Sequence, residues 1–450
     1  MKNKFVFCLL LATIISGQAY ATTLAEALKS AYETNPALEG QRAALRAIDE
    51  NMAIAKSGYR PTMSVSGQYK DVHANNNVVK VQDGYSRSLS ANLVQPIFRG
   101  FKTVNSMKSA DSYIRAEQNN LYNTEQDVIL ATATAYLDVM RDDAIVKLRT
   151  NNENLLKKRM EETNQRYNVG ELTRTDVSQA KARYSAAKSE RIASEGNLLA
   201  SKANYKEVVG EEAGDLVEPT WLPEFFPTDF EAAKQEALEN NYSVQYAKHL
   251  LAYKDYEIKN NIGDLLPSVN LNANATRGTE ESYTHKDPTT NSAYVGVSLD
   301  VPLYAGGASR AKIRKSKYEK WQAQDMVQQA ERAAISAVTS SWEYMNANKA
   351  KIASVKDQIQ AYEVALDGVR KEESLGNRTV LDVLDAYQDL LNSQVEEVSA
   401  LRDYYVSGLQ MLASVGKLTA ENLKLDVELY QPKKYYKETR DKWLSLSVDE

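Results

Sequence analysis

Strict alternation of apolar and polar residues follows Pro61 and again follows Pro267. A period of two residues predicts β-strands that have one apolar and one polar face. A second strand of the same kind follows each of these, so we predict two β-hairpins, at residues 61–97 and 267–303. The apolar positions of the four strands are Met63, Val65, Gly67 and Tyr69; Leu89, Ala91 and Leu93; Val269, Leu271, Ala273 and Ala275; and Val295, Val297, Leu299 and Val301.

A helical period replaces the strand period after each hairpin. Residues 102–167 contain neither Pro nor Gly, and a helix of that length is about 100 Å long. Apolar residues recur every seven positions or at alternating spacings of three and four, which is typical of coiled coils. We therefore predict two long helical hairpins, at residues 102–210 and 308–416, that turn at Gly170 and Gly376.

The two hairpin units are copies of each other. At an offset of 206 residues, Pro61 aligns with Pro267 and Gly170 with Gly376, and no gap is needed. We predict tandem repeats at residues 22–210 and 230–418, each opening with an amphipathic helix. Three prolines mark residues 211–229 as a linker. The polar tail, residues 419–450, is expected to be peripheral or partly disordered.

The N-terminus has the features of a secretory signal peptide. Lys2 and Lys4 precede an apolar run that ends at Ile15, and a small-residue motif ends at Ala21. We predict a signal peptide at residues 1–21, removed after Ala21. The only cysteine, Cys8, lies inside it, so the mature chain has neither a disulfide nor a lipid-anchored cysteine. This pattern indicates an exported bacterial protein.

Composition and motifs exclude several classes of function. The chain has 450 residues and a net charge of -5, so it lacks the basic character of nucleic-acid-binding proteins. Beyond residue 21 no apolar stretch approaches the roughly 18 residues that a membrane-spanning helix needs. The three histidines are scattered, and the glycine-rich turn at residues 304–310 lacks the lysine of a phosphate-binding loop. We expect no enzyme activity, no metal and no cofactor.

Strands with one apolar face suit a transmembrane β-barrel, although an ordinary soluble β-sandwich gives the same pattern. Four strands cannot close a barrel, since barrels in membranes have at least eight. Two, three or four chains would supply 8, 12 or 16 strands, and periodicity does not choose among them.

The complete arrangement resembles the TolC family of outer-membrane efflux and type I secretion ducts. The resemblance covers residues 22–420 and rests on the signal peptide, the two gapless copies and four turn motifs. The motifs are Gln95-Pro96-Ile97-Phe98-Arg99-Gly100, Val301-Pro302-Leu303-Tyr304-Ala305-Gly306-Gly307, residues 169–177 and residues 375–386. It implies a homotrimer with a twelve-stranded barrel in outer-membrane lipid, continuous with a periplasmic α-helical coiled-coil barrel. It also implies docking to a periplasmic adaptor and to an ABC or proton-driven inner-membrane transporter.

Two aspartates are candidates for an ion-selectivity ring. Asp382 and Asp385 are three residues apart, so they share one face of the predicted return helix near its start. The resemblance implies that a trimer stacks them into carboxylate rings at the periplasmic mouth, where they would attract cations. The alternative is that both carboxylates only stabilise the helix N-terminus.

The resemblance also implies a gate and a docking surface at the two turns. Asp176 and Arg378 would form a link that keeps the entrance shut, with Thr175 adding a hydrogen bond. Glu373 stands where the family has a gating tyrosine, and Tyr167 occupies the matching site of the first copy. The expected adaptor contacts are Val169, Gly170, Leu172, Leu375, Gly376 and Thr379. A periplasmic coiled-coil scaffold without a pore is the alternative function.

Overall fold

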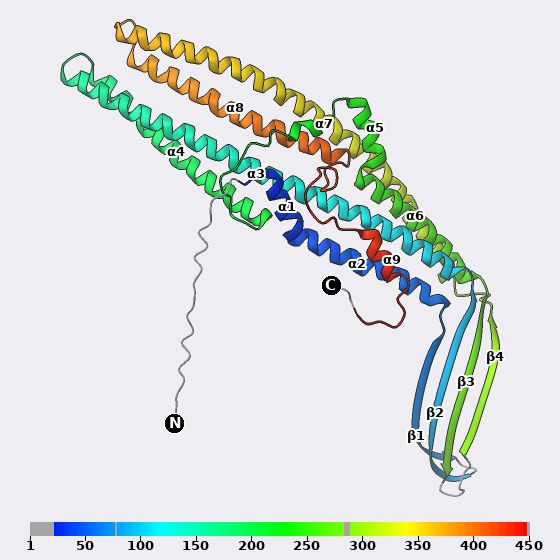
Figure 1. Ribbon diagram of the computed structural model, residues 1–450. Coiled ribbons are helices and arrows are strands. Elements are labelled where there is room, and N and C mark those ends of the chain that lie inside the picture. The colour runs from blue at the N-terminus through cyan, green and yellow to red at the C-terminus, as the bar shows by residue number, and fades with distance from the viewer. Residues whose placement is uncertain (1–21, 77–78, 283–288, 448–450) are drawn as a thin grey trace, which may run out of the picture.

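The computed structural model describes residues 22–76, 79–282 and 289–447 (Figure 1). The predicted signal peptide, residues 1–21, lies outside the described residues. A small sheet forms one end of an elongated molecule, and long helices run from it to two tips at the opposite end (Figure 1). Within the described ranges, no helix combines the length and the apolar character needed to cross a membrane.

The four strands form one antiparallel sheet in the order β1-β2-β3-β4. Its strands are β1 (Thr62–Asn76), β2 (Val79–Arg99), β3 (Ser268–Ser282) and β4 (Thr289–Asp300). The two copies therefore meet between β2 and β3. The register places Met63, Leu93, Ala273 and Val295 in one cross-strand row, so the apolar positions of all strands share one face. The predicted hairpins thus build a single two-faced sheet.

Amide and hydroxyl side chains cover the other face of the sheet. Asn274 Nδ2 donates to Asn92 Oδ1 at 2.6 Å, and the hydroxyls of Ser90 and Thr276 are 3.0 Å apart. These cross-strand bonds add to the backbone ladder. The outer edges of β1 and β4 pair with no other described strand.

The helices repeat the same order in both copies. The first copy has α1 (Leu24–Thr34), α2 (Pro36–Lys56), α3 (Lys102–Asn168) and α4 (Arg174–Val209), and the second has α5 (Phe230–Asn240), α6 (Tyr242–Ile262), α7 (Ala308–Ser374) and α8 (Val380–Ser414). Both α3 and α7 have 67 residues, or about 100 Å. The predicted fold class, mainly helical with a small sheet and two tandem repeats, is confirmed.

Each copy opens with two helices rather than the single helix that we predicted. Asn35 and Asn241 separate them, and each caps the following helix with its side-chain oxygen. The side-chain nitrogens reach the end of the same copy: Asn35 Nδ2 donates to the carbonyl of Val208 at 3.0 Å and Asn241 Nδ2 to that of Ser414 at 2.9 Å. An asparagine therefore breaks the helix and joins the two ends of each repeat.

The connection between the copies packs into the core near the middle of the molecule. It contains the short helix η2 (Leu222–Phe225), in which Leu222 is fully buried. The buried Tyr136 of α3 donates its hydroxyl to the carbonyl of Val217 at 2.7 Å and accepts from the backbone N–H of Val217 at 2.9 Å. Burial of Tyr136 raises its pKa above the usual value. The linker is therefore held by both packing and hydrogen bonds.

The C-terminal tail is packed more closely than the sequence suggested. Ala420 is fully buried in a cluster with residues of α1, α2 and α3, and α9 (Pro432–Thr439) contacts α2. In the part of the tail between Ala420 and α9, the ring centre of Tyr430 lies 5.3 Å from the guanidinium of Arg42 on α2. Our expectation of a peripheral tail is wrong for these residues, because the tail covers the buried stripe of α2.

Gly408 of α8 leaves room for the linker side chain Phe226. A Cβ atom at position 408 would lie 2.2 Å from Cζ of Phe226, which is only 7% exposed. We expect Gly408→Ala to destabilise the protein by about 1–3 kcal/mol, because the ring must move. The thermal unfolding midpoint of purified protein measures this effect. Gly368→Ala is the matched control, since no atom lies within 4 Å of its Cβ position; equal midpoints for the two variants would contradict the prediction.

Asp49 is buried on α2 without a hydrogen-bond partner for either carboxylate oxygen among the described residues. Burial, with a smaller effect from Glu50, raises its pKa to about 7. An unfolded aspartate titrates near 3.9, so between about pH 4 and 7 the folded state binds more protons. Stability should therefore fall as pH rises through this window.

Asp49→Asn should remove this pH dependence and stabilise the protein at pH 8 on the order of 2–4 kcal/mol. Thermal midpoints at pH 5 and pH 8, for both proteins, test this. A wild-type midpoint that does not fall between these pH values more than that of the variant would contradict it.

Candidate functional site

The two tips farthest from the sheet have the same backbone geometry. Gly170 follows α3 with φ +82°, and Gly376 follows α7 with φ +79°. No atom lies within 4 Å of a Cβ placed at either glycine. The glycines are therefore required by their left-handed backbone, which ends each helix, and not by lack of space.

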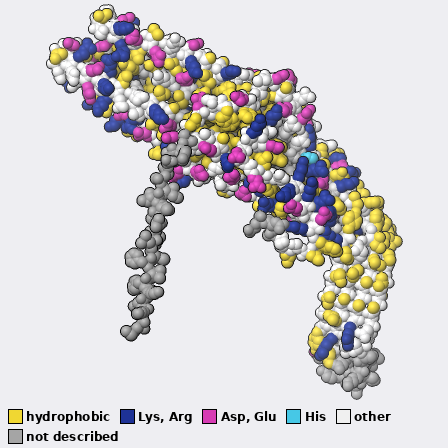
Figure 2. Space-filling model, in the orientation of Figure 1, with side chains coloured by type: hydrophobic (Ala, Val, Ile, Leu, Met, Phe, Trp, Pro, Cys, Tyr) yellow, Lys and Arg dark blue, Asp and Glu magenta, His cyan; other side chains and the backbone are white. Residues whose placement is uncertain are grey.

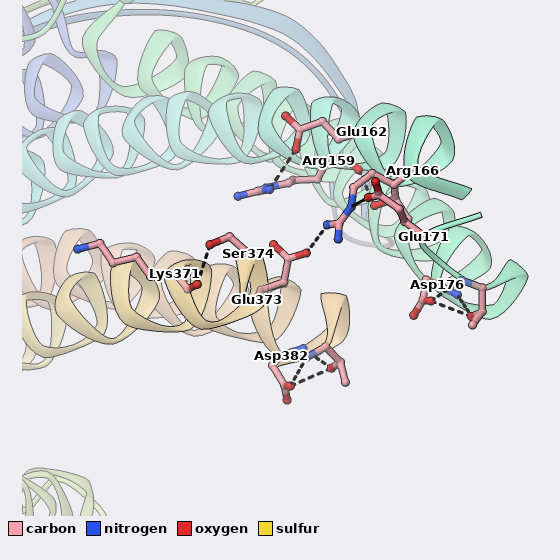
Figure 3. Close-up of polar contacts among 12 residues, drawn as sticks. Arg159, Glu162, Arg166, Glu171, Asp176, Lys371, Glu373, Ser374 and Asp382 are labelled. Carbon is pink, nitrogen blue, oxygen red and sulfur yellow. Dashed lines mark hydrogen bonds and ion pairs between the residues drawn. The ribbon is translucent and has the colours of Figure 1, made fainter. Parts of the chain in front are cut away.

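The return helices begin with matching capping boxes (Figure 3). In the first tip, Asp176 Oδ2 accepts from the backbone N–H of Thr173 at 2.9 Å and from its hydroxyl at 2.8 Å. In the second tip, Asp382 Oδ2 accepts from Thr379 at the same two distances. These bonds to Thr379, with the charge of Arg378, hold the pKa of Asp382 below its usual value. Both aspartates are thus held in place by the threonine caps of their helices.

The second candidate ring residue also has a partner within the chain. The carboxylate of Asp385 forms an ion pair with Arg183 of α4. About half of the Asp385 side chain remains exposed. The first turns of α8 therefore carry two oriented carboxylates. Asp382 is held in the capping box, and Asp385 is held by its ion pair with α4.

The predicted Asp176–Arg378 link does not form within this single chain. Asp176 is used by its capping box, and Arg378 Nε pairs with Glu372 Oε2 at 2.8 Å. The hydroxyl that bonds Asp176 belongs to Thr173, whereas Thr175 is exposed on the first turn of α4. The role of Asp176, Arg378 and Thr175 in the gate stays a prediction.

A different ion pair joins the two helical hairpins at their tips (Figure 3). Arg166 Nη1 at the end of α3 lies 2.5 Å from Glu373 Oε1 at the end of α7. Its Nε lies 3.1 Å from Glu171 Oε2, just beyond the turn. The Glu373 side chain is only 11% exposed. Bonds to Glu373 and Glu171 raise the pKa of Arg166, so the arginine stays charged.

Sequence reasoning noted Glu373 as a departure from the family pattern but did not find its partner. The sequence contains one indication of this ion pair. At the offset of 206 residues, the basic Arg166 of the first copy aligns with the acidic Glu372 of the second copy. Opposite charges at matching helix ends indicate that the ends attract each other. The choice of Glu373 over Glu372 depends on how the helices are rotated, which periodicity does not specify.

Small apolar clusters hold the four helices together behind the tips. Leu384 of α8 packs with Leu156, Ala180 and Ala187 of the first hairpin. Beyond these clusters the turns are open to solvent: Val169 is 72% exposed and Leu375 is 75% exposed. Leu172 is half-buried, and Thr379 serves as a helix cap. The apolar tip residues are therefore free for contact in the single chain.

Comparisons with known proteins agree with this architecture. The model of the family described as "Outer membrane efflux protein" matches residues 27–211 and 233–417, one match to each copy. The outer membrane efflux protein BepC of Brucella suis is 35% identical over 442 residues, covering 97% of this chain and 95% of BepC. The outer membrane protein TolC of Escherichia coli is 25% identical over 426 residues, covering 91% of this chain and 85% of TolC.

A solved structure has the same fold. The outer membrane protein VceC of Vibrio cholerae superimposes with a TM-score of 0.75 at 18% identity, covering 87% of this chain and 96% of VceC. The family match spans both copies, and the relatives match nearly end to end. The chain belongs to the outer membrane efflux protein family.

Proposed function

We propose that three copies of this chain form a duct that carries proteins or small molecules out of the cell. The observation that carries this proposal is a sheet at the end of helical hairpins about 100 Å long. The sheet has one apolar face and two edges that pair with no other described strand. Pairing β4 of one copy with β1 of the next would close a twelve-stranded barrel and leave no edge. The helices would continue the passage across the periplasm.

The tips would then form the inner entrance of the duct. A periplasmic adaptor would contact exposed apolar residues such as Val169 and Leu375, and an inner-membrane transporter would supply the cargo. The duct itself would be a passive conduit without catalysis. The substrates passed to it would decide whether it serves efflux or type I secretion.

We assign the gate within each protomer to the ion pair of Arg166 and Glu373. Opening the entrance requires the two helical hairpins to separate, and this pair joins their ends. Asp176 and Arg378 would add the link between neighbouring protomers. Each partly exposed pair contributes about 0.5–1 kcal/mol, so three copies bias the closed state without locking it.

Replacing Glu373 with Gln should raise the resting open probability of the channel. Loss of three pairs at the stated strength shifts the closed-to-open ratio by about tenfold or more. Single-channel recordings in planar bilayers measure this ratio. Glu162→Gln is the matched control, because Glu162 pairs with Arg159 inside α3 and, within the described part of the chain, forms no ion pair with another helix. If both variants gate like the wild type, Arg166 and Glu373 do not hold the entrance.

The double variant Asp382→Asn, Asp385→Asn should reduce the preference for cations. In a trimer these residues would place six carboxylates around the entrance, and such rings select cations. Because the pKa of Asp382 is lowered, wild-type selectivity should persist at about pH 5, above the ordinary aspartate pKa of roughly 3.9. Reversal potentials in a salt gradient give the selectivity.

Asp176→Asn is the control for this experiment, since it removes the matching negative charge from the capping box of the first tip. Its selectivity should equal that of the wild type. Unchanged selectivity in the double variant would leave Asp382 and Asp385 as helix-stabilising charges only. A wild-type protein that gives no conductance would instead favour the scaffold without a pore.

A further inference from the structure

The apolar face of the sheet ends in a row that contains an arginine. On the proposed function, on which this inference rests, this face meets lipid. The strand register orders its side chains into cross-strand rows, and Val269 and Leu299 form the row nearest the helices. Five rows further out, Arg87 stands between Tyr69 on β1 and Thr279 on β3.

The position of this row fits one edge of a membrane. Ten residues separate Val269 from Thr279 along β3. At about 3.3 Å per residue and a strand tilt of about 40°, the row lies roughly 25 Å above the first row. The apolar band of outer-membrane barrels is also about 25 Å tall. Arg87 therefore lies at the level of the headgroups on the side away from the helices.

Two tyrosines fix the orientation of Arg87. The rings of Tyr69 and Tyr85 stack with centres 6.1 Å apart. The guanidinium of Arg87 lies 4.8 Å from the centre of Tyr85 and 5.8 Å from that of Tyr69. Stacking on aromatic rings holds the plane of a guanidinium and leaves its N–H groups at the rim free to donate.

A second arginine lies diagonally across the strands. Arg277 is opposite Leu89 on β3, one row closer to the helices than Arg87 and on the same face. Diagonal neighbours in a sheet are about 7–8 Å apart, which two long side chains can bridge around one anion. Among the described residues, neither arginine forms an ion pair. The next row outward on this face, that of Tyr85, contains two acidic residues, Asp71 on β1 and Glu281 on β3.

Lys and Arg side chains are visible near the far end of the strand region, beside hydrophobic side chains that cover much of it (Figure 2). Guanidinium groups bind phosphate through paired, charge-assisted hydrogen bonds. The lipid that meets an outer-membrane barrel at its outer edge is a phosphorylated glycolipid. We propose that Arg87 and Arg277, with Tyr69 and Tyr85, form a binding site for the phosphate groups of this outer-leaflet glycolipid.

Native mass spectrometry of the detergent-purified protein tests the site, with diphosphoryl lipid A as the probe. The double variant Arg87→Gln, Arg277→Gln should bind the probe about tenfold more weakly than the wild type. Lys70→Gln is the matched control, because Lys70 lies next to Tyr69 but on the opposite face, paired with Ser86. Its binding should stay within about twofold of the wild type.

A second probe keeps the test independent of how the variant folds. The wild type should bind lipid A that lacks both phosphates about tenfold more weakly than the diphosphoryl form. Equal binding of both forms, or full binding by the double variant, would overturn the site. Bilayer conductance of the wild type separates the two proposals: a conducting channel without phosphate-dependent binding overturns the lipid site alone, and a protein without conductance overturns both.

Discussion

Backbone hydrogen bonding is the constraint on which this architecture depends. The sheet has paired strands in its middle and two edges that pair with no other strand among the described residues. In a hydrocarbon layer each unpaired group costs several kcal/mol, so the sheet is stable there only as part of a closed barrel. The sheet carries hydrogen-bonded polar side chains, including Asn92 and Asn274, on one face and apolar rows on the other. These are the two faces that a barrel wall needs. On the proposed function, the chain is therefore one part of a larger ring.

The two repeats share the same order of helices and strands, whereas contacts between the repeats form where their side chains differ. Thr173 and Thr379 cap their helices with the same bonds, 206 residues apart. By contrast, the tip helices end in opposite charges, and the ion pair of Arg166 with Glu373 exists only because the two copies differ there. The two copies have the same backbone geometry at their tips but different side chains, and those side chains form an ion pair between the copies.

Sequence patterns predicted the elements because each pattern is local. Alternation fixed the faces of the strands, and the run without Pro or Gly fixed the length of α3. The break at Asn35 was missed because asparagine is also tolerated inside helices, and its bond to Val208 is distant in sequence. The packing of Ala420 and the partner of Glu373 depend on tertiary placement, which periodicity does not contain.

The two asparagine bonds have a consequence for the order of events during folding. Each joins residues 173 positions apart, from the second helix start of a copy to the end of its last helix. Contacts of such high sequence separation form late and slow the folding of a domain. An emerging chain cannot complete the first copy until Val208 has been exported. The edge of β2 stays exposed for longer still, because its partner β3 belongs to the second copy, and such an edge is a site for periplasmic chaperones to protect.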